Sequence, residues 1–279
     1  MKQRVISALI GLAILAIVIL NFNTLVLNIA VALIIIIAID ELLSASDCKK
    51  NRALYFTALC FGGAIPFLKI QILADKLPCV MFLFTLILFC IMLKYHGELD
   101  FFRVGFSFCF TLAIALSATC LVYMRDLYGN AVGLYAIIVT LTGAWMSDTG
   151  AYFFGITMGK RKLAPLISPK KTVEGALGGV VTALAAQLLF SYIYSLILLK
   201  LGIHCHINYV FLAICSPLIS LVSMVGDLTA SIIKRQCGIK DFGKIMPGHG
   251  GVLDRFDSVF MVIPFVYNLF LFFPLIQIK

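Results

Sequence analysis

LVLNIAVALIIIIAIDELL, at residues 25–43, decides the fold class, because this almost continuous apolar run is as long as one membrane crossing. A helix needs about 20 apolar residues to cross about 30 Å of hydrocarbon. Similar runs lie on both sides of it, and the full set spans residues 5–20, 25–43, 53–72, 79–95, 101–123, 132–157, 172–199, 208–233 and 252–278. The sequence predicts an all-α polytopic membrane protein with about nine transmembrane helices.

The composition of the 279-residue chain supports the same fold class. Residues of the AVILMFWYC set make up 62% and charged residues 13%, against about 45–50% and about 25% in ordinary soluble domains. The apolar runs are continuous rather than alternating, which excludes a porin-type barrel. The nine cysteines are scattered without a CxxC pair, so we interpret them as small apolar residues.

The distribution of basic residues predicts the orientation of the chain. A net charge of +9 would indicate nucleic acid in a soluble protein, but here the positive-inside rule accounts for it. With the N-terminus in the cytoplasm, 17 of the 22 Lys and Arg residues lie inside. We therefore predict a cytoplasmic (inner) membrane protein with its C-terminus outside and no nucleic-acid partner. No cleavage site follows the first run, which we expect to be retained as a helix.

Polar residues concentrate in the second half of the chain. Two late loops, 158–171 and 234–251, carry an excess of Lys and Arg beyond what orientation requires. The first five apolar runs contain few polar residues. We predict an N-terminal transmembrane scaffold at residues 1–130 and a C-terminal catalytic transmembrane domain at residues 131–279.

Four aspartates at or near the expected helices of the second half are candidate functional residues. An ionised Asp inside a membrane helix costs about 2.5–3.5 kcal/mol, so Asp148, Asp227, Asp254 and Asp257 each need an explanation. Asp254 and Asp257 share a helix face, and two neighbouring carboxylates repel unless a cation lies between them. Mg²⁺ suits such a site. The alternatives are that Asp254 favours the helix dipole and that Asp148 pairs with a lysine.

The run from Asp227 to Arg235 places an acid, a hydroxyl and two cations on one helical face. Ser231, Lys234 and Arg235 follow Asp227 at the fourth, seventh and eighth positions. An intrahelical ladder of ion pairs would give the same pattern. However, such a ladder does not require Gly226 or a position at the depth of a span, so we favour a functional site.

The segment SPKKTVEG, at residues 168–175, has the pattern of a helix start. Ser168 is expected as the N-cap, with Lys170 and Lys171 in the first turn. The helix dipole disfavours cations there, and an anionic phosphate would account for both lysines. The alternative is a basic flank attracted to anionic lipid headgroups.

Small residues predict close packing of two helices. Gly143, Ser147 and Ala151 recur at every fourth position of one run. Gly175 and Gly179 form a GxxxG pattern in the next run. Such faces let helix backbones approach each other closely.

Three stretches carry a resemblance to a known family. SIIKR at 231–235, KDFG at 240–243 and PGHGGVLDRFD at 247–257 are similar to the signature of the phosphatidate cytidylyltransferase (CDP-diacylglycerol synthase) family. Residues 145–155 and 168–172 resemble other blocks of that family. The resemblance implies the reaction CTP + phosphatidate → CDP-diacylglycerol + pyrophosphate.

This resemblance and the residue patterns together define the expected site. Mg²⁺ is expected on Asp227, Asp254 and Asp257, with Lys234 as a further catalytic residue. Substrate contacts are expected from Asp148, Ser168, Lys170, Lys171, Thr172, Ser231, Arg235, Lys240, Lys244, His249, Gly250, Gly251 and Arg255.

The expected partners are CTP, phosphatidic acid and membrane lipid. The resemblance also implies a homodimer and a second, monovalent cation such as K⁺. Two alternatives remain open from the residues alone: a CTP-dependent lipid kinase and a transporter with intramembrane carboxylates. A transporter would be expected to show matching halves with broken helices, and we find no internal repeat.

Overall fold

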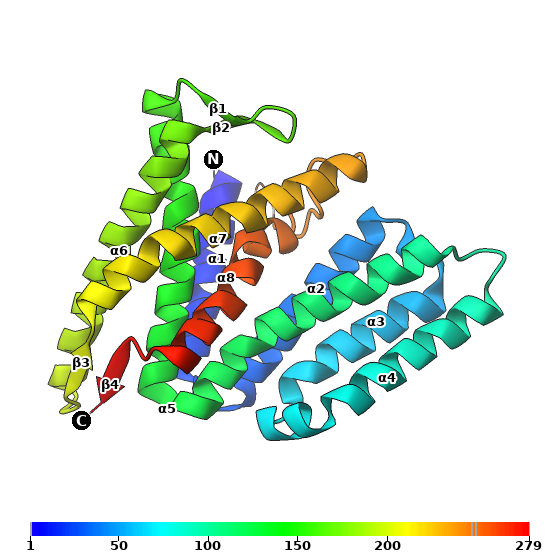
Figure 1. The fold of residues 1–279 in the computed structure, drawn as a ribbon, viewed down its shortest axis with the longest axis horizontal. Helices are drawn as coiled ribbons and strands as arrows, with labels where there is room; N and C mark the ends of the chain where they lie inside the picture. The colour runs from blue at the N-terminus through cyan, green and yellow to red at the C-terminus, as the bar shows by residue number, and fades with distance from the viewer. Residues whose placement is uncertain (1, 247, 249, 279) are drawn as a thin grey trace. The chain divides into compact units, whose positions relative to one another are not determined.

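The computed structural model describes residues 2–246, 248 and 250–278, and its main elements are helices (Figure 1). The α-helices are α1 (Lys2–Leu20), α2 (Leu25–Ala45), α3 (Arg52–Ala64), α4 (Ile70–Lys94), α5 (Phe101–Met158), α6 (Val173–Lys200), α7 (Tyr209–Gln236) and α8 (Leu253–Phe272). Two short 3₁₀ helices are η1 (Cys48–Lys50) and η2 (Ile65–Phe67). The strands are β1 (Lys162–Ala164), β2 (Ser168–Thr172), β3 (Cys205–Ile207) and β4 (Ile276–Ile278).

Within the described residues, six helices are long and apolar enough to cross a membrane: Leu25–Ala45, Asp75–Lys94, Phe101–Met158, Val173–Lys200, Tyr209–Gln236 and Leu253–Phe272. Two shorter apolar helices, Leu9–Leu20 and Arg52–Phe67, accompany them. This confirms the prediction of an all-α polytopic membrane protein. The count of nine spans and their orientation stay predictions.

Helix α5 contains two of the nine predicted spans, 101–123 and 132–157. A straight helix of its 58 residues would be about 87 Å long, far more than the hydrocarbon thickness of about 30 Å. The helical backbone is interrupted at Gly129, whose φ of 73° and ψ of 179° are not helical. The non-helical Gly129 therefore separates two segments that are each long enough for a crossing.

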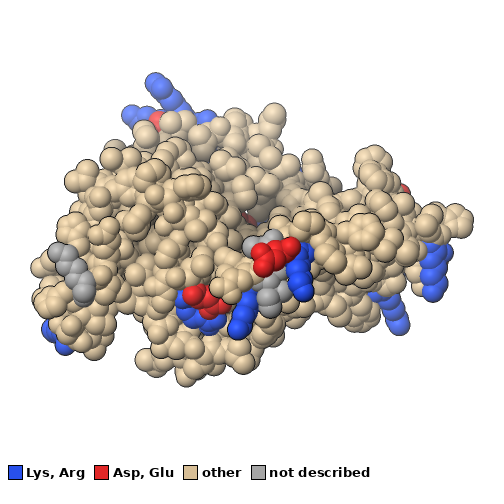
Figure 2. All heavy atoms as spheres, turned by 60° about the horizontal axis from the view of Figure 1, so that its bottom comes forward, with Lys and Arg blue, Asp and Glu red and all other residues tan. Residues whose placement is uncertain are grey.

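The surface is largely apolar, as expected for a protein covered by lipid. Leu12 and Leu20 on α1 are 69% and 83% exposed, and Leu93 on α4 is 71% exposed. On the face drawn in Figure 2, Lys, Arg, Asp and Glu form a few small groups among uncharged residues. In water such a surface would be unfavourable, whereas hydrocarbon solvates it.

The chain forms two compact units. Unit 1 consists of Met1–Asp126 and Cys237–Arg255, and unit 2 of Leu127–Gln236 and Phe256–Lys279. The division into a scaffold at residues 1–130 and a catalytic domain at residues 131–279 stays a prediction. The return of residues 237–255 to the N-terminal unit has no counterpart in the predicted domains.

The start of helix α6 differs from the prediction. We expected Ser168 as the N-cap, but residues 168–172 form strand β2, which pairs with β1 in an antiparallel hairpin. Thr172 is the N-cap instead, and its Oγ1 accepts the N–H of Gly175 at 3.1 Å. The prediction was wrong because Ser and Thr are both good caps, and the pairing with Lys162–Ala164 extends the backbone at Ser168.

The last helix also ends earlier than predicted. Helix α8 stops at Phe272, close to Pro274, and residues 276–278 form strand β4 rather than continuing the helix. Strand β4 pairs with β3, with Ile207 opposite Ile276. In Figure 1 the paired strands β3 and β4 lie at the end of α6 opposite to the β1–β2 hairpin. The pairing places the end of α8 beside the α6–α7 connection.

Candidate active site

Five charged side chains of unit 2 come from four elements and form what we call the acid–lysine cluster. It consists of Asp148 on α5, Lys171 on β2, Asp227 and Lys234 on α7, and Asp257 on α8. All five were singled out in the sequence as candidate site residues. Residues up to 109 positions apart, from Asp148 to Asp257, are therefore brought together by the fold of one unit.

Two ion pairs connect these elements. Lys171 Nζ pairs with Asp227 Oδ2, and both side chains are about three-quarters buried. Lys234 Nζ lies 3.7 Å from Asp257 Oδ2, with the two side chains 14% and 9% exposed. One pair joins α7 to β2 and the other joins α7 to α8. Both pairs are sheltered from water. In such an environment Coulomb interactions are stronger than at an exposed surface.

Asp148 lies among the other acids of the cluster. Ser258 Oγ donates a hydrogen bond to Asp148 Oδ2 at 2.9 Å. Asp227 and Asp257 are close enough to repel the Asp148 carboxylate, and Lys171 is close enough to attract it. Three acids with two lysines thus share a small region. Such a concentration of acids is favourable only where cations balance it.

Small residues allow these helices to approach each other. A Cβ on Gly226 would lie 2.8 Å from the carbonyl oxygen of Asp257, so the glycine before Asp227 lets α7 contact α8. A Cβ on Gly179 would lie 2.7 Å from the carbonyl oxygen of Ser147. Ser147 Oγ also lies 2.6 Å from Ser220 Oγ, which joins α5 to α7. The predicted close packing of the small-residue faces is confirmed.

The other predicted residues of unit 2 differ in their exposure. Lys170 is exposed, while its neighbour Lys171 is largely buried in its pair with Asp227. Ser168 is half-buried in strand β2. On α7, Ser231 is half-buried and Arg235 is exposed. The fold therefore separates the environments of two lysines that the sequence treated as a pair.

The glycine-rich loop before α8 belongs to unit 1. Asp254 Oδ2 accepts the N–H groups of Phe242 at 2.8 Å and Gly251 at 3.0 Å. Gly250 has a φ of 86°, which favours glycine. Asp254 thus has a structural task at the start of α8, while its assignment to a metal stays a prediction.

The remaining loop residues are placed as follows. Lys240, Lys244 and Arg255 are exposed. His249 lies outside the described residues.

Glu41 on α2 is a residue that the sequence analysis missed. It is 3% exposed, and its carboxylate accepts the N–H groups of Val252 at 2.9 Å and Leu253 at 2.7 Å. An acid inside an apolar run carries the insertion cost that we applied to the four aspartates. The same argument would have identified Glu41, which lies near the end of the run quoted first.

The donor set of the acid–lysine cluster fits a magnesium ion chemically. Mg²⁺ prefers carboxylate oxygens, usually takes only one or two of them from the protein, and keeps water and substrate phosphates as further ligands. Asp227 and Asp257 provide such oxygens on two helices in close contact. Among the residues that the structure describes, no three His, Cys, Asp or Glu side chains are grouped as a complete metal site.

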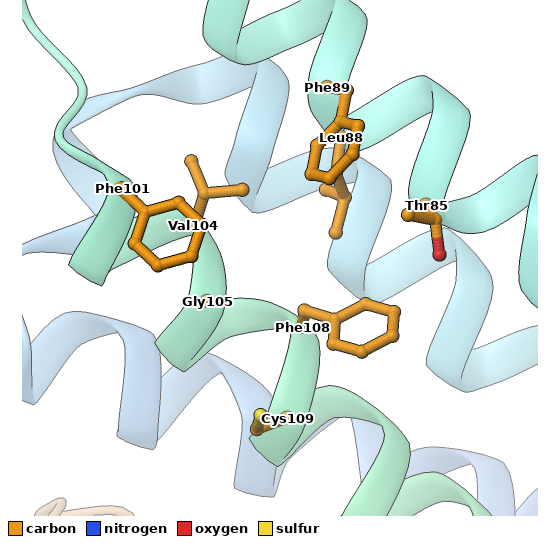
Figure 3. Close-up of a pocket in the computed structure, with 8 residues that line it drawn as sticks. All are labelled: Thr85, Leu88, Phe89, Phe101, Val104, Gly105, Phe108 and Cys109. Carbon is orange, nitrogen blue, oxygen red and sulfur yellow. The ribbon is translucent and has the colours of Figure 1, made fainter.

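An apolar pocket in unit 1 is a different kind of feature. Figure 3 shows it between α4 and the beginning of α5, lined by Leu88, Val104, Phe108 and other apolar side chains. Thr85 supplies a hydroxyl at its edge. The pocket lacks charged groups, so it offers nothing to hold a phosphate.

The fold and the cluster define an α-helical membrane protein with a sheltered group of acids and lysines in unit 2. Residues 2–273 match the model of the Cytidylyltransferase family, and the chain belongs to that family. It is 38% identical to the phosphatidate cytidylyltransferase of Bacillus subtilis (strain 168) over 71% of this chain and 70% of that protein. Enzymes of the same name in Staphylococcus epidermidis (strain ATCC 12228) and Staphylococcus aureus (strain COL) are 33% and 32% identical, each over 95% of this chain and 96% of theirs.

Proposed function

We propose that this protein is a phosphatidate cytidylyltransferase that converts CTP and phosphatidate to CDP-diacylglycerol and pyrophosphate. A phosphate oxygen of phosphatidate attacks the α-phosphorus of CTP, and the bond from that phosphorus to the pyrophosphate oxygen breaks. The observation that carries the proposal is the acid–lysine cluster in a chain that resembles enzymes of that name over 95% of its length. Family membership supports a cytidylyl transfer, and the apolar helices suit a lipid substrate.

The chain's own residues would supply charge and position rather than a strong base. The phosphate of phosphatidate is already an anion, so the main barrier is the approach of two anions. Lys171 and Lys234 lie where their ammonium groups could turn from Asp227 and Asp257 toward phosphate oxygens. Arg235, Lys240, Lys244 and Arg255 are proposed to attract the CTP phosphates.

Magnesium is proposed to be held by Asp227 and Asp257, with Asp254 kept as a third candidate from the sequence. When bound, the ion would neutralise negative charge on the departing pyrophosphate. The lysines that face these carboxylates balance their charge in the structure. A homodimer and a second, monovalent cation such as K⁺ are further proposals that depend on the family resemblance.

The protein is proposed to lie in the cytoplasmic membrane with its basic loops in the cytoplasm, where CTP is present. Nine crossings would place 17 of the 22 Lys and Arg residues inside. The pairing of β3 with β4 supports an even number of crossings between the α6–α7 connection and the C-terminus, which α7 and α8 provide.

The test is product identification with purified protein, CTP, Mg²⁺ and phosphatidate. The proposal predicts CDP-diacylglycerol and pyrophosphate in equal amounts. A lipid kinase would instead release CDP and add a phosphate to its lipid. A transporter would leave CTP unchanged. Either of the last two results would overturn the proposal.

A further inference from the structure

Glu41 joins two parts of unit 1 that are far apart in the sequence. Its Oε1 accepts the N–H of Val252, and its Oε2 accepts the N–H of Leu253, the first residue of α8. These donors lie 211 and 212 positions away. The first N–H groups of a helix lack intrahelical partners, and a carboxylate there is favoured by the helix dipole. Glu41 therefore caps α8 from another helix.

Two glycines of the loop leave room for this carboxylate. A Cβ added to Gly243 or to Gly251 would collide with the carboxylate atoms of Glu41. Neither glycine has a positive φ, unlike Gly248 and Gly250. The backbone at Gly243 and Gly251 could therefore accept alanine, and close contact with Glu41 explains the missing side chain.

The loop is held by acids on two sides. Asp254 binds the N–H groups of Phe242 and Gly251, and Glu41 binds those of the next two residues, Val252 and Leu253. Four backbone donors around the start of α8 are thus occupied by carboxylates. Because a charged acceptor roughly doubles the strength of such a bond, this part of the loop has one strongly favoured conformation.

We propose that Glu41 is a positioning residue for cytidylyl transfer. Its carboxylate fixes residues 242–243 and 250–254 in their reactive arrangement without touching the substrate. The inference rests on the proposed function of the glycine-rich loop. It also gives α2, which the sequence predicts to be scaffold, a direct influence on the reaction. A displacement of about 1 Å at a reacting centre can reduce turnover about 100-fold, so a loosened loop should act on kcat.

The test compares Glu41→Gln with Asp40→Asn in the full-length protein. Asp40 is the neighbouring acid of α2, and it accepts hydrogen bonds from Lys49 at 2.6 Å and Tyr55 at 2.7 Å rather than from the loop. Glu41→Gln keeps the size of the side chain but converts one acceptor to a donor. We expect a 10- to 100-fold lower kcat at saturating CTP and phosphatidate for Glu41→Gln and less than a twofold change for Asp40→Asn.

Hydrogen exchange provides a second readout that does not depend on catalysis. Amides of residues 250–253 should exchange faster in Glu41→Gln and at the wild-type rate in Asp40→Asn. If Glu41→Gln fails to fold, Gly243→Ala disturbs the same carboxylate from the loop side and should give the same two effects. Where both fold, the double variant should lose little more than the stronger single variant, because the two residues act through one contact.

The possible outcomes separate this inference from the proposed function. Absence of CDP-diacylglycerol with the wild-type protein would refute the function but leave the exchange prediction to be tested. Unchanged exchange at residues 250–253 in Glu41→Gln would refute the capping role. A kcat within twofold of wild type would refute the influence on turnover. An equal loss in Asp40→Asn and Glu41→Gln, in proportion to thermal stability, would reduce Glu41 to a structural residue.

Discussion

Lys170 and Lys171 are neighbours in strand β2, yet their environments differ. Successive side chains of a strand point to opposite faces, and here Lys171 pairs with Asp227 while Lys170 is exposed. The sequence alone predicted the same task for both lysines, because it placed them together in a helical turn. We therefore propose the phosphate-binding role mainly for Lys171.

We therefore predict unequal effects of Lys170→Gln and Lys171→Gln. Lys171→Gln should lower kcat/KM for CTP about 10- to 100-fold, since charge-assisted contacts are worth about 1.5–3 kcal/mol. Lys170→Gln should change it less than threefold. The assay uses neutral detergent micelles, where attraction to anionic lipid is absent apart from the substrate. Lys50→Gln, in an exposed ion pair with Asp47, controls for the lost charge; equal effects at all three positions would contradict the assignment.

The acids of the cluster should connect turnover to magnesium. If Asp227 and Asp257 hold the ion, Asp227→Asn and Asp257→Asn should abolish turnover. Wild-type protein should also unfold at a higher temperature as Mg²⁺ is added, because a ligand of the native state stabilises it. Both variants should lose this rise.

An acid outside the cluster provides the control for this prediction. Asp47→Asn removes a carboxylate from an exposed ion pair and should keep both turnover and the Mg²⁺-dependent rise in Tm. Near-normal activity of Asp257→Asn at saturating Mg²⁺ would show that this carboxylate only balances Lys234.

At the scale of elements, the contact of α5 with α6 positions Asp148. Gly175 and Gly179 of α6 lie against the backbone of α5, at Ala151 and Ser147. Ser147 directly precedes Asp148. The small residues therefore determine how closely α6 approaches the helix that carries one of the acids.

Replacing Gly179 by alanine should force these helices apart. Alanine is normally favoured over glycine inside a helix by about 1 kcal/mol, but here its Cβ would lie 2.7 Å from the Ser147 carbonyl oxygen. We expect a loss of about 1–3 kcal/mol from overpacking, measured as a lower Tm in detergent. Gly11→Ala in α1 has no atom within 4 Å of the new Cβ and should be neutral or stabilising. A Tm for Gly179→Ala at or above that of Gly11→Ala would contradict the packing argument.

At the scale of the whole molecule, the sequence predicted what local patterns determine. Apolar runs identified the helices, because the length and apolarity of each run are by themselves enough to indicate a helix in lipid. The β3–β4 pairing and the return of residues 237–255 to unit 1 depend on contacts between distant segments. The same distinction applies to the candidate site. The cost of inserting an acid into a membrane helix pointed to the aspartates, but no local pattern links Glu41 to Leu253.

The topology can be tested with two native cysteines on either side of α7. Cys205 lies in β3 and Cys237 follows α7, and both are partly exposed. In variants that keep only one of them, an impermeant thiol reagent should label Cys205 in intact cells and Cys237 only after permeabilisation. Burial raises the pKa of both thiols, so labelling should accelerate as the pH rises and more thiolate forms.

The C-terminus gives the matching prediction for the ninth crossing. Because β4 pairs with β3, an epitope fused after Lys279 should be accessible from the same side as Cys205. The positive-inside rule makes this the outer side, since the basic segments lie beyond the opposite ends of α6 and α7. An epitope on the cytoplasmic side together with an external Cys205 would contradict the strand pairing. If both probes were on the cytoplasmic side, the orientation would be the reverse of the predicted one. The basic loops at residues 158–171 and 234–251 would then lie outside, away from CTP.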